Sequence, residues 1–526
     1  MSSFAPHRLA TSLEERIRSL EVDFHRAYWE SQIEATAETD ARRAELELEL
    51  RRVKGEPEAL IEVREALEEE LHDPVLRRQL EVLRLSLTAN QMSDPLREEI
   101  VALSTRVESE FASYRPEVNG RRLSDNEILE ILTSSDDVEL RKRAWEASKE
   151  VGTRVEGSVR ELARLRNQAA RDLGFADFYR MSLELAELSE EWLLKTLDEI
   201  ERLTEEPFRA YKGALDDRLR DRFGVQELRP WHYADPFFQE VPPDARLPLD
   251  HLLGERSATD LTLKSFAAWG IDLSGVLERS DLYPRERKNQ HAFCIDVDRL
   301  GDVRILANVV PGEHWMSIML HEAGHAAYDV EIDPELPYLL RRSTHIFVTE
   351  AMAILSGRLV RSPRWLIDVA GVSESEVYEI AHELTRSNAA QDLVMARWVP
   401  VMAHFERELY SDPEGDLDSL WWELVERFQL ISPPPDRSAP DWAAKIHVSV
   451  APVYYHSYLL GAMLASQIER AIERDCGALL SKEAGRWLVE RLFRPGNLLR
   501  WDALIEEATG VPLRADDLAD WVRRAT

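Results

Sequence analysis

The segment from Trp315 to His325 reads Trp-Met-Ser-Ile-Met-Leu-His-Glu-Ala-Gly-His, an apolar helical pattern that ends in two histidines four residues apart. Residues at positions i and i+4 of an α-helix share one face, so the imidazoles of His321 and His325 can reach one metal ion. Glu322 is adjacent to the first histidine, where its carboxylate can point to a metal-bound water. The segment therefore predicts a zinc-binding helix in which Glu322 activates water.

Gly324 lies inside this predicted helix, where glycine costs about 1 kcal/mol relative to alanine. We therefore expect another backbone to approach it closely. A second helix is predicted over residues 343–355, with a Ser or Thr N-cap and the apolar spacing of a buried helix. Its Glu350 is the candidate third ligand, because a carboxylate between Val348 and Met352 would otherwise be costly to bury. A partly exposed helix glutamate is the alternative interpretation.

Two further residues lie close to the motif in the sequence. Asp329 follows His325 by one helical turn, so it could accept a ring N–H from a ligating histidine. A surface aspartate near the end of the helix is an equally good interpretation. His345 could also approach the metal, but its neighbours are typical of core packing, so we leave it out of the predicted site.

Helical patterns fill most of the chain. Between Leu13 and Tyr28, apolar residues recur at three- and four-residue steps, as an amphipathic helix requires. Glycines and prolines interrupt the helical patterns at Gly55 and Pro57, at Asp73-Pro74, at residues 241–243 and at residues 432–435. The clearest β signal is a hairpin over residues 291–297 and 303–310, directly before the metal motif. We therefore predict a mostly α fold with a small β-hairpin beside the zinc site.

The chain has 526 residues, and it lacks a flexible Gly/Ser linker or a fixed-period repeat. We therefore predict one large helical unit over residues 1–526, arranged in two lobes. Residues 1–230 would form an N-terminal helical part. Residues 231–526 would carry the zinc site and the substrate-binding residues.

Composition excludes several classes of function. The 66 basic and 98 acidic residues give a formal charge of −32, which repels phosphate backbones and argues against nucleic-acid binding. No stretch of about 18 to 20 apolar residues could cross a membrane, and the N-terminus lacks the features of a signal peptide. Only two cysteines occur, without metal-site spacing. We expect a soluble, cytoplasmic protein with reduced cysteines.

The motif residues resemble those of the gluzincin peptidases, in particular the angiotensin-converting-enzyme (peptidyl-dipeptidase A) family and the related thimet oligopeptidase and oligoendopeptidase F families. The matching parts are Arg304-Ile305, residues 321–325, Thr349 to Ala351, residues 27–32 and residues 167–171. The resemblance implies a bilobed helical fold around a deep central channel, with the N-terminal part as its lid. It also implies one bound Zn²⁺ and short peptides as substrates.

A further matching region begins at Lys445 and contains a cluster of tyrosines. The resemblance implies that His447 and Tyr458 face the scissile carbonyl, where neutral O–H and N–H donors can stabilise an oxyanion. It also implies that Lys445 grips the free carboxylate of the substrate, assisted by Tyr455. Either Tyr454 or Tyr455 would face the substrate. An ordinary solvated lysine is the alternative interpretation of Lys445.

This region departs from the pattern of the converting-enzyme family in two ways. His447 and Tyr458 are separated by one residue more, and Ser457 replaces an expected arginine, which argues against chloride activation. Upstream, His291-Ala292 resembles the edge strand whose backbone pairs with an extended substrate in that family. Ala292 would then act through its main chain.

These residues together predict a zinc metallopeptidase. Zinc would lower the pKa of its water and polarise the scissile carbonyl, while Glu322 transfers the proton of the water to the leaving amine. Release of C-terminal dipeptides and internal cleavage by an oligoendopeptidase both remain open. A Taq-type metallocarboxypeptidase is a further alternative, although its His-Glu-Ser-Gln signature is missing around Glu350. The non-enzyme alternative is a helical binding scaffold with a vestigial zinc site, and the oligomeric state is left open.

Overall fold

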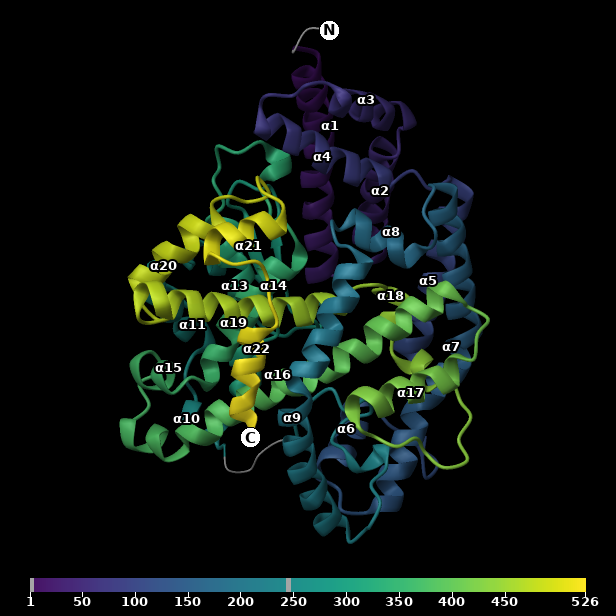
Figure 1. Cartoon of the computed structure of the whole chain (residues 1–526), viewed down its shortest axis with the longest axis vertical. Helices are drawn as coiled ribbons and strands as arrows, with labels where there is room; N and C mark the ends of the chain where they lie inside the picture. The colour runs from purple at the N-terminus through teal and green to yellow at the C-terminus, as the bar shows by residue number, and fades with distance from the viewer. Residues whose placement is uncertain (1–3, 243–246) are drawn as a thin grey trace. The chain divides into compact units, whose positions relative to one another are not determined.

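The computed structural model describes residues 4–242 and 247–526. Helices account for 70% of the structure, and the sheets among the described residues are two antiparallel pairs of short strands. These features confirm the predicted mostly α class (Figure 1). Within the described ranges, no helix is both long enough and apolar enough to span a membrane.

The chain forms two compact units, and each is assembled from three separate stretches of sequence. Unit 1 comprises Met1–Gln91, Arg246–Leu384 and Leu460–Asp517, and unit 2 comprises Met92–Ala245, Thr385–Leu459 and Leu518–Thr526. Residues distant in the sequence therefore pack together within each unit. The division at residue 230 and the central channel stay predictions.

Unit 1 contains the predicted metal helix, α13 (Glu313–Val330), and the second predicted helix, α14 (Ile346–Gly357), which pack side by side. Its remaining helices are α1 (Phe4–Ile33), α2 (Ala37–Lys54), α3 (Pro57–Glu68), α4 (Pro74–Thr88), α10 (Leu249–Leu253), α11 (Ala258–Trp269), α12 (Ser274–Arg279), α15 (Pro363–Asp368), α20 (Lys482–Leu488) and α21 (Trp501–Thr509). Single turns of 3₁₀- or π-helix occur at Tyr338–Leu340, Arg358–Arg361 and Val489–Phe493.

Unit 2 is built around two long helices, α7 (Val138–Asp172) and α9 (Glu190–Phe223). Its other elements are α5 (Asp94–Ser113), β1 (Glu117–Val118), β2 (Arg121–Arg122), α6 (Asp125–Ser134), α8 (Phe178–Leu185), α17 (Leu417–Gln429), α18 (His447–Val450) and 3₁₀ turns at Pro230–His232, Asp441–Ala444 and Arg523–Ala525. Three helices contribute residues to both units, namely α16 (Glu374–Ser411), α19 (His456–Cys476) and α22 (Asp516–Val522).

The predicted helix breaks fall where proline or glycine interrupts the pattern. Helix α2 ends before Gly55, and α4 begins at Pro74 with Asp73 as its N-cap. The segment 432–435, with its three prolines, lies outside any helix, and Pro243 lies outside the described residues. The predicted Ser or Thr cap of α14 is wrong, because the Nδ1 atom of His345 accepts the hydrogen bond from the Phe347 N–H.

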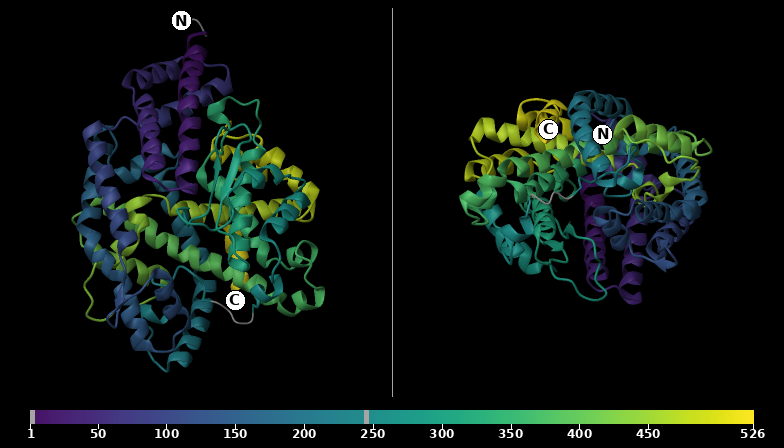
Figure 2. Two further views of the ribbon diagram at one scale, coloured as in Figure 1. Left: turned by 180° about the vertical axis from the view of Figure 1, so that it is seen from behind. Right: turned by 90° about the horizontal axis from the view of Figure 1, so that it is seen from below.

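The predicted hairpin is present as β3 (Phe293–Asp296) and β4 (Val303–Leu306). The strands pair antiparallel, with Phe293 opposite Leu306 and Asp296 opposite Val303. The hairpin, drawn as arrows in Figure 2, packs on α13. Asp281 forms a parallel bridge to Leu306, so the outer edge of β4 is covered by a preceding loop.

A buried ion network joins α1 to the hairpin turn within unit 1. The carboxylate of Glu21 lies 2.5 Å from the ammonium of Lys54 and 2.8 Å from a guanidinium nitrogen of Arg299. The hydroxyl of Tyr338 also donates to Glu21, at 3.1 Å. Burial opposes ionisation, but Arg299 and Lys54 outweigh it and hold the pKa of Glu21 at about 2. The ionised form of Glu21 therefore stabilises this network.

We expect Glu21→Gln to lower stability at neutral pH and to have progressively less effect in acid. A shift of the Glu21 pKa from 4.5 to about 2 is worth roughly 3 kcal/mol. Because the pKa is depressed on folding, this stability is present above pH 4.5 and is lost as the pH falls towards 2. The difference between the urea midpoints of wild type and variant, followed from pH 7 to pH 3, measures it. A difference independent of pH would contradict the assignment.

Candidate metal centre

The three predicted metal ligands lie together, on two adjacent helices. One ligand atom from each of His321, His325 and Glu350 falls within 4.8 Å of the others. The Nε2 atom of His321 is 3.6 Å from Glu350 Oε1, and that of His325 is 3.8 Å from Glu350 Oε2. Glu350 is only 5% exposed, so the alternative of a partly exposed helix glutamate is wrong.

Close helix packing makes this grouping possible. A Cβ atom on Gly324 would lie 2.7 Å from the Met352 carbonyl oxygen and 2.9 Å from the Ala353 Cα atom. Only a glycine allows the backbones of α13 and α14 to approach this far. The predicted backbone contact at Gly324 is therefore confirmed, and its partner is the helix that carries Glu350.

The backbone of a second glycine packs against the Glu350 side chain. Gly461, in α19, lies close to this side chain, because an added Cβ atom would lie 3.0 Å from Glu350 Cγ and 3.2 Å from Ile354 Cδ1, which is tighter than an ordinary contact. The α19 backbone thus limits the positions open to the Glu350 carboxylate.

The donor set fits zinc. A tetrahedral zinc with bonds of about 2.0–2.1 Å holds its ligand atoms roughly 3.4 Å apart, close to the separations observed between Glu350 and each histidine. Burial lowers the pKa of His321 to about 4 and that of His325 to about 3, so both imidazoles are neutral, as ligation requires. Burial also raises the pKa of Glu350 to about 7, and a bound cation would favour its ionised form.

Glu322 lies on the same helix as the histidines and is buried. Burial, reinforced by the nearby Glu350 carboxylate, raises the pKa of Glu322 to about 8, while a hydrogen bond from the Cys294 backbone acts in the opposite direction. Cys294 belongs to β3, so the hairpin contacts the predicted base. A carboxyl group whose pKa lies near neutrality can both accept and release a proton.

Thr349 supports a metal ligand in a way that the sequence motifs did not reveal. Its hydroxyl oxygen lies 2.8 Å from His325 Nδ1. When Nε2 of His325 binds the metal, Nδ1 carries the ring proton and donates a hydrogen bond to the Thr349 hydroxyl. Burial and the charge of Asp296 raise the pKa of Asp329 well above its usual range, against the charge of Arg299, and the two interpretations of Asp329 stay predictions. His345 caps α14, which agrees with its omission from the site.

We expect Thr349→Val to weaken zinc binding by about ten- to a hundredfold, because groups that orient a ligating histidine contribute this much. Valine keeps the shape of threonine and removes only the hydroxyl. Competition against a chelator of known zinc affinity measures the change, and Thr349→Ser serves as the control that retains the hydroxyl. Equal zinc affinity in all three proteins would show that Thr349 has no such role.

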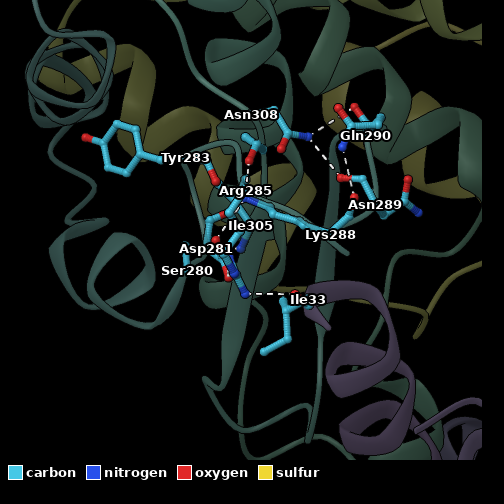
Figure 3. A network of polar contacts seen from close by, with 11 residues as sticks. Ile33, Ser280, Asp281, Tyr283, Arg285, Lys288, Asn289, Gln290, Ile305 and Asn308 are labelled. Atoms are coloured by element: carbon cyan, nitrogen blue, oxygen red, sulfur yellow. Dashed lines mark hydrogen bonds and ion pairs between the residues drawn. The ribbon is translucent and has the colours of Figure 1, made fainter. Parts of the chain in front are cut away.

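The segment before β3 is held by a buried polar network (Figure 3). The fully buried ammonium of Lys288 donates to the Asp281 carboxylate at 2.8 Å, to the Tyr283 carbonyl at 2.8 Å and to the Ala307 carbonyl. Asn308 donates to the carbonyls of residues 289 and 290, at 3.0 and 3.1 Å. The loop therefore enters the hairpin in a fixed position.

His291 and Ala292 lie at the end of this loop, immediately before β3 rather than within it. The N–H of His291 donates to the Asn289 side chain, at 2.9 Å. Asn289 in turn bonds to Gln32 at the end of α1. The structure thus anchors the predicted edge segment to α1, and its pairing with substrate stays a prediction.

The remaining predicted residues gather within unit 2. The Lys445 ammonium donates to Gln239 Oε1 at 2.6 Å, and the Tyr455 hydroxyl donates to the same atom at 3.4 Å. Lys445 is only 7% exposed, so the solvated-lysine alternative is wrong. Burial lowers its pKa to about 8, against the opposing charges of Asp235 and Glu240. Gln239 was missed because a single glutamine far away in the sequence carries no signal.

Aromatic contacts connect this group to the predicted oxyanion donors. The His447 and Tyr455 rings are 4.9 Å apart, and Tyr458 lies 5.4 Å from Tyr455 and 5.3 Å from Tyr454, all between ring centroids. Burial, with the charge of Lys445, lowers the pKa of His447 to about 4, so its imidazole is neutral. Among the described residues, His447 Nδ1 is buried without a hydrogen-bond partner.

Known protein families match both halves of the sequence. Residues 276–523 match the sequence model of peptidase family M3, and residues 5–210 match that of angiotensin-converting enzyme. The first range contains the His-His-Glu group and the region from Lys445 to Tyr458. The chain resembles the gluzincin peptidases. These matches confirm the resemblance predicted from the motifs. Because both families consist of metallopeptidases, the matches also support the interpretation of the protein as a peptidase that uses zinc.

One curated relative illustrates the degree of similarity. An angiotensin-converting enzyme-related protein of Drosophila melanogaster is 25% identical over 244 residues, which are 42% of this chain and 38% of the relative. The match covers well under half of the relative's length. It therefore supports the gluzincin resemblance, and activity and substrates are matters for proposal.

Proposed function

We propose that the protein is a zinc-dependent peptidase for short oligopeptides, with His321, His325 and Glu350 as the metal ligands. The observation that carries this proposal is the grouping of two neutral imidazoles and one carboxylate beside Glu322, on helices packed through Gly324. Both matching families consist of peptidases.

In this mechanism each residue has a separate task. Zinc, when bound, would polarise the scissile carbonyl and increase the acidity of water. Glu322 accepts a proton from the attacking water and delivers it to the leaving amine. His447 and Tyr458 would donate hydrogen bonds to the developing oxyanion, and the neutral imidazole of His447 suits this role. No Ser or Cys nucleophile is needed.

The direct test uses a mixture of short peptides and mass spectrometry of the products. The zinc-loaded protein should cleave the peptides, and removal of the metal with a chelator should stop cleavage until zinc is restored. A protein that is fully loaded with zinc and cleaves nothing would favour the helical binding scaffold. The cleavage positions also distinguish dipeptide release from internal cutting.

We propose further that the enzyme releases C-terminal dipeptides. Lys445, Gln239 and Tyr455 form a buried polar group whose cation can bind the free carboxylate of a peptide. Asp235 accepts the backbone N–H of Gln239 at 3.2 Å, which fixes this group. The match to peptidase family M3, which covers Lys445 and Tyr455, favours an oligopeptidase as the second candidate.

We expect peptides with amidated C-termini to be poor substrates of wild type. Lys445→Ala should lower kcat/KM for free-acid peptides by roughly ten- to a hundredfold and change that for amidated peptides little, because a charged hydrogen bond contributes about 1.5 to 3 kcal/mol. Gln239→Glu should act in the same direction by adding a repelling charge. Lys264 is exposed and does not belong to this group, so Lys264→Ala provides a control. Equal cleavage of both peptide forms by wild type would favour the oligopeptidase.

A further inference from the structure

The segment between His447 and Tyr458 contains a strained turn. Val453 has φ = +56°, in the left-handed region that L-residues with a branched Cβ rarely adopt. Among the described non-glycine residues with positive φ, Val453 is the β-branched one. The turn lies inside the stretch that is one residue longer than the pattern of the converting-enzyme family. Such a conformation persists only when its surroundings hold it.

The hydrogen bond that holds this turn comes from α16. The carboxyl oxygen Oε1 of Glu406 accepts the N–H of Val453 at 2.8 Å, and Glu406 is only 2% exposed. Burial raises the pKa of Glu406 to about 8, while the Val453 N–H and the charge of Arg166 act in the opposite direction. A carboxyl group keeps an accepting oxygen in either protonation state. The bond to Val453 therefore does not require ionisation.

A second helix holds the same segment from another direction. Arg166, in α7, donates from Nη2 to the carbonyl of Ser449 at 2.6 Å and from Nη1 to the Tyr410 hydroxyl at 3.1 Å. Ser449 belongs to α18, which begins at His447. The segment is thus anchored at two places, by α7 before the turn and by α16 at the turn, and Arg166 also joins these two helices through Tyr410.

The direction of the chain after the turn decides where the tyrosines lie. Tyr454 and Tyr455 follow Val453 directly, and the Tyr458 N–H donates to the Tyr455 carbonyl at 3.2 Å. A change of φ at Val453 would rotate all of these residues relative to His447. We propose that Glu406 is a positioning residue, which holds the Val453 turn and thereby sets the orientation of Tyr455 and Tyr458.

This inference rests on the proposed function, because it assigns Tyr458 a role in the reaction. The first measurement is therefore independent of activity. A crystal structure of zinc-loaded Glu406→Met, which has a similar volume and no accepting oxygen, should show Val453 outside the left-handed region and the Tyr455 hydroxyl displaced from Gln239. An unchanged φ at Val453 would overturn the proposal. If Glu406→Met does not fold, Glu406→Asp, whose shorter side chain cannot reach the Val453 N–H, takes its place.

The second measurement is kinetic. Glu406→Met should lower kcat by about ten- to a hundredfold, the effect of a small misplacement of catalytic groups, with little change in zinc content. Glu406→Gln, which retains an accepting oxygen, should keep kcat within a few-fold of wild type. In a Tyr458→Phe background the Glu406→Met effect should largely disappear.

The outcomes separate the two claims. If Glu406→Met lowers kcat as strongly in the Tyr458→Phe background as it does in wild type, positioning through Tyr458 is overturned. A Tyr458→Phe enzyme with wild-type kcat would instead refute the catalytic role proposed for Tyr458, while the crystal structure still decides whether Glu406 holds the turn. Reduced thermal stability of Glu406→Met with unchanged kcat would show that Glu406 acts only in folding.

Discussion

Glu322→Gln should retain zinc and lower kcat by about 10² to 10⁴, the usual contribution of general acid–base catalysis. The amide preserves the size of the side chain and removes its ability to accept a proton. Because Glu322 is separate from the three ligand atoms that lie together, its substitution should leave the metal in place. Zinc content from elemental analysis and kcat from a fluorogenic peptide, measured on one preparation, test both parts.

A matched control is available on the same helix. Glu331 is the C-cap residue of α13, so Glu331→Gln makes the same chemical change away from the metal group. It should leave kcat within a few-fold of wild type. Activity of Glu322→Gln close to that of this control would eliminate Glu322 as the general base. Loss of zinc from Glu322→Gln would instead show that its carboxylate contributes to metal binding.

Glu350→Ala should lose zinc during dialysis that leaves wild type fully loaded. The substitution leaves two imidazoles, which form an incomplete donor set for a catalytic zinc. Ionic attraction between the carboxylate and the cation is lost as well, and in a buried site this attraction is screened little. Activity should fall with the metal content.

The measurement is the ratio of zinc to protein after dialysis against a weak chelator, with Glu322→Gln prepared in parallel. The two variants should give opposite patterns, with zinc present and activity absent for Glu322→Gln, and both absent for Glu350→Ala. Glu350→Ala with a full complement of zinc would show that another residue is the third ligand. Gly461→Ala offers a milder test, because its added methyl group would press on Glu350.

Features that depend on local spacing could be predicted from the sequence. Two histidines one helical turn apart share a face in any α-helix, so the metal helix needed no knowledge of the rest of the chain. A glycine inside a helix lowers helix stability, so Gly324 likewise predicted that another backbone approaches it closely. The backbone of Met352 makes this approach. The hairpin before the motif and the helix breaks at prolines follow from local backbone geometry in the same way.

Only the tertiary structure decided which side chains support these residues. Thr349 reaches His325, Gln239 reaches Lys445, and Glu406 reaches Val453, through contacts between segments that are distant in the sequence. Such pairs have no periodicity, because their geometry depends on how whole helices pack. The sequence by itself therefore determined the metal helix and the class of chemistry, while packing determined how each functional side chain is held.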